Sequence, residues 1–122
     1  MKYRSRVSLM SVALIFASTP SYAANIGCPG VTLPYVGIDA NGVVATTIEN
    51  AGIVNICSVA TTMGGVAPAT CQSWYSTILT HRTISKKITY YFDTNNPTNI
   101  GITTCASLGN FQTRVPYFIE LN

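Results

Sequence analysis

The four cysteines limit how this chain can fold more than any other feature of the sequence. They lie at Cys28, Cys57, Cys71 and Cys105. An even number of cysteines in a small exported chain predicts a disulfide framework, here of two bridges. The pairing we favour joins Cys57 to Cys71 across a short loop and Cys28 to Cys105 across a long one. The pairing of Cys57 with Cys105 and of Cys28 with Cys71 stays open, because sequence alone does not choose among connectivities.

The expectation of export comes from residues 1–23. Positive charges at Lys2, Arg4 and Arg6 precede an apolar run over residues 7–17. Small residues then occupy the two positions that a signal peptidase reads in Ser21-Tyr22-Ala23. We therefore interpret residues 1–23 as a secretory signal, too short for a lasting membrane span. Residues 24–122 form one small domain in the periplasm or outside the cell.

Cys28 has a second interpretation as a lipid attachment site. Ile26-Gly27-Cys28 resembles the end of a lipoprotein signal, but Asn25 stands where an aliphatic residue is expected. Lipid on Cys28 would also leave three cysteines, an odd number. The disulfide interpretation is therefore the stronger of the two.

The charges of the domain exclude nucleic acid as an expected partner. Residues 24–122 hold four basic and four acidic side chains: Arg82, Lys86, Lys87 and Arg114 against Asp39, Glu49, Asp93 and Glu120. A net charge of zero offers no basic patch that could neutralise a run of phosphates. No second apolar stretch is long enough for a membrane span.

The pattern of apolar residues and turns predicts the order β-β-β-α-β-β. Strands are expected at 31–39, 43–49, 53–60, 86–93 and 117–121, and a helix at 69–83. Asn41-Gly42 and Asn50-Ala51-Gly52 supply the two tight turns of a β-meander. Residues 28–30 are predicted to form a turn. Residues 94–114 are predicted to form a long loop with a short strand at 100–103. A loop of this length is either functional or held in place by Cys105. This order is that of an OB-fold-like small barrel, closed or nearly closed, which would hide its strand edges.

The predicted helix follows Pro68, which suits a first helical turn. One stripe of the helix holds Cys71, Trp74, Tyr75, Ile78, Leu79 and Arg82. Their spacing is that of a helix face packed against a sheet. The opposite, polar face holds Ser73, Thr77, Thr80 and His81.

The domain lacks the residue patterns of catalysis, so we do not expect an enzyme. It has one histidine and four widely spaced carboxylates, in which no catalytic triad can be recognised. One histidine does not supply the ligand cluster of a metal site, and no cofactor is expected. His81 as a base or ligand is weighed against an exposed polar residue on the helix, and the second is favoured. Gly64-Gly65 lacks the lysine of a phosphate-binding loop and is interpreted as a flexible turn.

Aromatic residues outside the helix indicate a binding function. Five of them are candidates for binding: Tyr35, Tyr90, Tyr91, Phe111 and Tyr117. Aromatic rings stack on the C–H faces of sugars, whose hydroxyls find polar partners nearby. Most of these rings are expected to fill the barrel. We select Tyr91 and Lys87, which share a strand face, and Tyr35 as candidate ligand-binding residues.

The second half of the chain resembles a set of small exported proteins of Gram-negative bacteria. The resemblance rests on the helix segment 71–80, on Lys86-Lys87 and the aromatic strand that follows, on Cys105, and on the closing segment 117–119. More distantly, the chain is similar to the B subunits of subtilase-type and typhoid-type toxins. This resemblance implies an OB-fold, a pentameric ring and binding of sialylated glycans.

In such rings the helix lines a central pore, which implies that Ser73, Thr77 and His81 face it. The glycan pocket of these B subunits uses a serine early in the meander. The only serine in the three predicted strands is Ser58, in the third strand. No pocket residue is therefore carried over.

Two functions follow from these features. The first is a non-catalytic secreted or periplasmic binding domain for a glycan, assembled as a homo-oligomeric ring like the toxin B subunits. The alternative is a small periplasmic structural or inhibitory protein that acts through a protein surface and binds no sugar.

Overall fold

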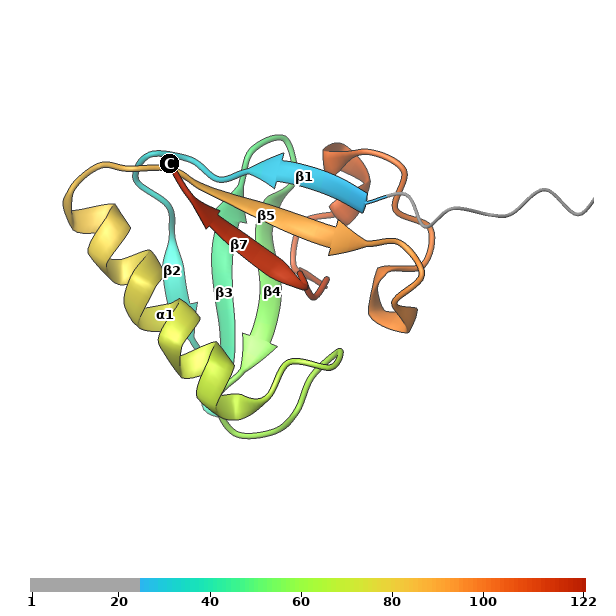
Figure 1. The fold of residues 1–122 in the computed structure, drawn as a ribbon, viewed down its shortest axis with the longest axis horizontal. Coiled ribbons are helices and arrows are strands. Elements are labelled where there is room, and N and C mark those ends of the chain that lie inside the picture. The colour runs from blue at the N-terminus through green and yellow to red at the C-terminus, as the bar shows by residue number, and fades with distance from the viewer. Residues whose placement is uncertain (1–24) are drawn as a thin grey trace, which may run out of the picture.

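The computed structural model describes residues 25–122 as a mainly β chain with one α-helix (Figure 1). The expected export signal, residues 1–23, lies outside the described residues. The strands are β1 (Asn25–Pro29), β2 (Val36–Ile38), β3 (Val43–Ile48), β4 (Gly52–Ser58), β5 (Ile88–Asp93), β6 (Gln112–Thr113) and β7 (Phe118–Leu121). The helix α1 (Pro68–Thr83) separates β4 from β5. Two short 3₁₀ helices, η1 (Pro97–Asn99) and η2 (Cys105–Leu108), follow β5.

The strands form two open sheets, in the orders β1-β5-β7 and β2-β3-β4-β6. All neighbours are antiparallel except β4 and β6, which are parallel. In Figure 1 the strands of the first sheet cross those of the second. The predicted class, mainly β with one helix and two disulfides, is confirmed. A closed barrel is not shown.

Two chain segments run from one sheet to the other. After β1, the Gly30 N–H donates to the Ile88 carbonyl (2.7 Å), and the Glu49 N–H donates to the Pro29 carbonyl (2.9 Å). Between β6 and β7, the Arg114 N–H donates to the Asn55 carbonyl (2.9 Å), and the Tyr117 N–H donates to the Tyr91 carbonyl (2.9 Å). These backbone hydrogen bonds hold the two sheets together at both crossings.

The core lies between the two sheets. Along β5, Ile88, Tyr90 and Phe92 are buried and the residues between them are only partly covered, as the alternating pattern predicts. The facing side chains of the other sheet are Val44, Ile48, Val54 and Ile56. Burial raises the pKa of Tyr90 to about 12, so this phenol is neutral at physiological pH.

The β-meander is present as β2, β3 and β4, joined by the two predicted turns. Gly42 (φ +83°), Asn50 (φ +65°) and Gly52 (φ +94°) adopt the left-handed conformations that these turns need. The side chain of Asp39 closes the first turn by accepting the Asn41 N–H (2.8 Å).

Three local predictions are wrong. The turn predicted at residues 28–30 overlaps strand β1 (Asn25–Pro29), because Cys28 and Pro29 pair with β5. Only Val36–Ile38 of the predicted 31–39 strand is regular, since the residues before it cross between the sheets. Residues 100–103 form no strand, whereas β6 does at 112–113. The observed order is therefore β-β-β-β-α-β-β-β.

The helix begins at Pro68, one residue before the predicted range 69–83, and its buried stripe is narrower than expected. Cys71 and Ile78 are buried, and Trp74 and Tyr75 are half-buried. Leu79 and Arg82 are exposed, because α1 packs mainly against β4. No helix of residues 25–122 is both long and apolar enough to cross a membrane.

The favoured disulfide pairing is confirmed. Cys28 bonds to Cys105 across 77 positions, and Cys57 bonds to Cys71 across 14. The first bridge ties β1 to η2, and the second ties β4 to α1. The alternative pairing is excluded, and Cys28, engaged in a disulfide, is not free to carry lipid.

Candidate functional site

The three predicted site residues do not share one site. Tyr35 directly precedes β2 in the four-stranded sheet, whereas Lys87 and Tyr91 belong to the β5 region of the three-stranded sheet. Each therefore has its own set of neighbours.

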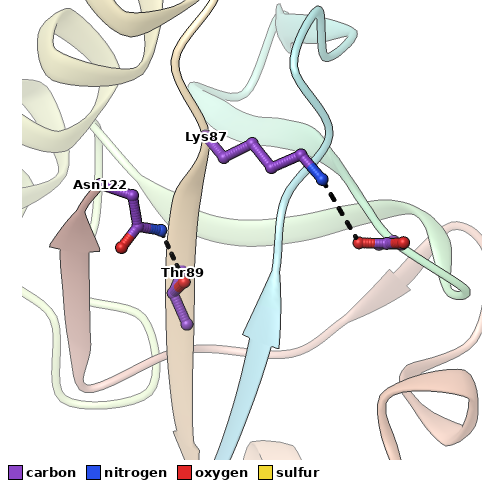
Figure 2. Close-up of polar contacts among 4 residues, drawn as sticks. Lys87, Thr89 and Asn122 are labelled. Carbon is purple, nitrogen blue, oxygen red and sulfur yellow. Dashed lines mark hydrogen bonds and ion pairs between the residues drawn. The ribbon is translucent and has the colours of Figure 1, made fainter.

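Lys87 forms an ion pair with Glu49, with Nζ 3.9 Å from a carboxylate oxygen (Figure 2). In Figure 2 the Lys87 side chain extends to the opposite side of β5 from Asn122, whose Nδ2 donates to the Thr89 hydroxyl (2.9 Å). About half of each charged side chain is exposed, so this pair contributes at most about 1 kcal/mol. The Lys87 side chain is thus already paired with Glu49, which directly follows β3 of the other sheet.

Tyr91 lies on the outer face of the three-stranded sheet and already has partners there. Its hydroxyl donates to the Glu120 carboxylate, and this hydrogen bond raises the pKa of the Tyr91 phenol. Its ring packs on Phe118, with centroids 5.7 Å apart, and covers Gly27 of β1, where a Cβ would come within 2.9 Å of it. The ring therefore mainly joins the three strands of its sheet.

Tyr35 lines a groove of about 290 Å³ on the outer face of the four-stranded sheet. A second aromatic residue, Phe111, lines the same groove. Both rings are largely open to solvent, with exposed fractions of 54% and 65%. The remaining lining residues are Gly37, Ile38, Asp39, Val43, Ala45, Ile53 and Asn55.

Backbone hydrogen bonds to the central strands position both aromatic residues. The Tyr35 N–H donates to the Thr47 hydroxyl (3.0 Å), and the Tyr35 carbonyl accepts the Thr47 N–H (3.2 Å). The Phe111 N–H donates to the Ile53 carbonyl (2.6 Å), and the Ile53 N–H donates to the Asn110 side chain (2.9 Å). The rings are therefore carried by backbone that β3 and β4 hold in place.

The groove between the two rings is lined by apolar residues, one amide and the carboxylate of Asp39. Tyr35 lies over Gly37, since a Cβ there would collide with the tyrosine ring and its hydroxyl. Ala45 and the half-buried Asn55 come from β3 and β4. The Asn55 side chain carries both hydrogen-bond donors and an acceptor. Two aromatic rings and an amide thus converge on one hollow.

Phe111 adopts a strained backbone conformation. Its φ of +57° lies in the left-handed region, which is unusual for a bulky residue. Such strain often accompanies functional positions, where surrounding contacts enforce it. The sequence marks Phe111 only as one of several aromatic residues outside the helix, so its role in the groove was missed.

We predict that Phe111→Gly is about 1 kcal/mol more stable than Phe111→Ala, because only glycine adopts a positive φ without steric cost. For a domain of this size the melting temperatures should differ by about 4–8 °C. Thermal unfolding of the two variants by circular dichroism measures this difference. Equal melting temperatures would mean that the Phe111 backbone is not strained.

No protein-family model, curated protein or solved structure matches this chain. The geometry of the groove therefore carries the functional argument.

The other candidates from the sequence have structural partners. The His81 ring nitrogen Nδ1 lies 3.1 Å from the Thr77 carbonyl of the same helix. Gly64 and Gly65 form a turn closed by hydrogen bonds between Met63 and Val66. The buried Ser58 hydroxyl accepts two backbone N–H groups just after β4. Within residues 25–122, no three His, Cys, Asp or Glu residues gather in a way that could hold a metal ion.

Proposed function

We propose that this chain is an exported, non-catalytic carbohydrate-binding domain that holds a sugar in the groove between Tyr35 and Phe111. The observation that carries this proposal is the pair of solvent-exposed rings that line one hollow on the outer face of the four-stranded sheet. Folding normally buries such rings, and here backbone hydrogen bonds keep both at the surface.

The chemistry of the groove suits a sugar. Aromatic faces pack against the C–H groups of a pyranose ring, while hydroxyl groups need directional polar partners. The Tyr35 hydroxyl and the Asn55 amide supply such partners. A volume of about 290 Å³ is near the lower end of small-molecule sites, of the order of 300 Å³. It suits a short glycan end better than a long polymer.

An OB-like strand arrangement is part of this proposal. Three features support it: the helix between β4 and β5, the parallel pairing of β4 with β6, and the isolated bridge between Gly30 and Ile48. In OB-folds the outer face of the second and third strands commonly binds ligands. Those strands correspond here to β3 and β4, which contribute residues to the lining of the groove.

Export and ring assembly belong to the same proposal. Two disulfides support an oxidising compartment. In a ring, the helix face with Ser73, Thr77 and His81 would line the pore. Two of these side chains already contact the helix backbone. The Thr77 hydroxyl donates to the Ser73 carbonyl, and the His81 ring nitrogen Nδ1 lies 3.1 Å from the Thr77 carbonyl.

The alternative function, a protein-binding surface without sugar affinity, has its own supporting observation. Strand β7 is an edge strand, and apolar side chains in and beside it are about half exposed: Tyr117, Phe118 and Leu121. An exposed strand edge with apolar side chains is a typical surface for pairing with another chain.

The proposal predicts that Tyr35→Ala and Phe111→Ala each weaken sugar binding at least about tenfold, because each removes a stacking anchor from a small site. The oxidised domain, residues 24–122, is screened on a glycan array, and the best hit is titrated calorimetrically. Its mass in solution is measured on the same sample, and a strictly monomeric protein would contradict the ring.

The matched control is Tyr117→Ala, an equally exposed ring on the other sheet, which should keep full sugar affinity. Circular dichroism confirms that all three variants are folded. If no glycan binds, or if both groove variants bind as tightly as the original protein, sugar binding in this groove is wrong. A protein partner whose binding Tyr117→Ala abolishes would support the alternative.

A further inference from the structure

We propose that this groove selects neutral and amine-bearing sugars and discriminates against acidic glycans; the inference rests on the proposed sugar binding. It follows from the charge that lines the groove and from the placement of the four cations in the described part of the chain. The charge at the groove is negative, and the cations lie elsewhere.

Asp39 is the charged residue that lines the groove. Its Oδ1 accepts the Asn41 N–H (2.8 Å) and the Val43 N–H (2.9 Å). These hydrogen bonds fix the carboxylate at the turn between β2 and β3, on the same hollow as Tyr35 and Phe111. The carboxylate is exposed, and its second oxygen makes no hydrogen bond to the described residues. A bound sugar would therefore lie beside a fixed negative charge.

None of the four cations in residues 25–122 lines the groove. Lys87 pairs with Glu49. Arg114 donates from its guanidinium group to the carbonyls of Leu108, Thr98 and Ile100, each at 3.2 Å. Arg82 and Lys86 flank the C-terminal end of α1. An acidic sugar would find no compensating positive charge in the groove.

The aromatic surface formed by Tyr91 and Phe118 also lies beside a negative charge. Tyr91 and Phe118 lie beside Glu120, whose carboxylate accepts the Tyr91 hydroxyl. Lys87 points from the same strand region to Glu49. Neither aromatic surface is thus built for a carboxylate or sulfate ligand. The sialylated glycans that the resemblance to toxin B subunits implies are acidic and do not fit this charge.

The expected selectivity is modest, because the Asp39 carboxylate is in contact with water. Interactions between exposed charges change affinity by about two- to fivefold, and salt reduces the effect. An amine-bearing glycan should therefore bind about two- to fivefold more tightly at low salt than its neutral N-acetylated form. An acidic analogue should bind more weakly than the neutral form by a similar factor.

Asp39→Asn is the decisive variant, because an asparagine Oδ1 can accept the same two N–H groups and keep the turn. The original protein and the variant are screened at low salt on one array with neutral, glucosamine-bearing, and sialylated or uronate-bearing glycans. We expect the original protein to prefer the first two classes. In the variant the ratio of the affinities for amine-bearing and neutral N-acetylated glycans should fall to about one.

The outcomes separate this inference from the proposed function. Binding to acidic glycans that Tyr35→Ala abolishes would overturn the selectivity and leave sugar binding in the groove intact. An amine preference that Asp39→Asn does not change would also overturn it. Absence of binding to every glycan class would reject the proposed function, and the selectivity with it.

Discussion

Replacing Cys28 and Cys105 together by alanine should lower the free energy of unfolding by about 4.5 kcal/mol, because the bridge closes a loop across 77 positions. The bridge between Cys57 and Cys71 closes a loop across only 14, and its removal should cost about 3 kcal/mol. A domain of this size is stable by only about 5–15 kcal/mol. Loss of the long bridge therefore removes a large share of the stability and should lower the melting temperature by more than about 20 °C.

Denaturant unfolding of the two double-alanine variants measures both values, and their order is the critical result. A larger loss from the Cys57/Cys71 variant would contradict the loop-length explanation. It would point instead to packing around two sulfurs that are both fully buried. A variant that no longer folds at 25 °C without denaturant would still rank the two bridges.

Asn99→Ala should cost about 3 kcal/mol, because Asn99 satisfies three backbone groups at a fully buried position. Its Nδ2 donates to the carbonyls of Val115 (2.8 Å) and Asp93 (3.1 Å). Its Oδ1 accepts the Val115 N–H (3.0 Å). Alanine removes both side-chain groups and leaves their backbone partners unpaired. Chemical denaturation of the variant gives the loss directly.

The control for this position is Asn95→Ala, a nearby exposed residue whose loss should change stability by less than about 0.5 kcal/mol. Asn99→Asp provides a second test, since its carboxylate would face two carbonyl oxygens. This variant should be less stable than Asn99→Ala at pH 7 and should recover relative to it as the pH falls and the carboxyl group is protonated. Equal stability of Asn99→Ala and the original protein would mean that water replaces the amide without cost.

Local sequence patterns predicted the elements that local forces determine. The alternation along β5 places Tyr90 and Phe92 in the core, and Pro68 marks the start of α1. Strand β1 was missed because Asn25–Pro29 has no such alternation and becomes a strand by pairing with β5, more than 60 residues later. Gly27 belongs to that pairing, since its missing side chain leaves room for the Tyr91 ring.

The same limit applies to the candidate site. Tyr35 was selected from its residue type, but its aromatic counterpart lies 76 positions later. Only the pairing of β4 with β6 and the hydrogen bond from Phe111 to Ile53 bring the two rings to one groove. The long loop was expected to be either functional or pinned by Cys105. It is pinned by that cysteine and by Asn99, and it also supplies Phe111.

The hydrogen bonds that hold Tyr35 and Phe111 come almost entirely from their main-chain atoms. Any residue other than proline can make those bonds at position 35, whereas the positive φ at position 111 favours residues such as glycine and asparagine. A library randomised at position 35, and restricted at position 111 to residues that tolerate a positive φ and at position 39 to aspartate and asparagine, should consist largely of folded proteins. Such a library could be selected for new ligands, which makes this small disulfide-linked framework a starting point for engineered recognition.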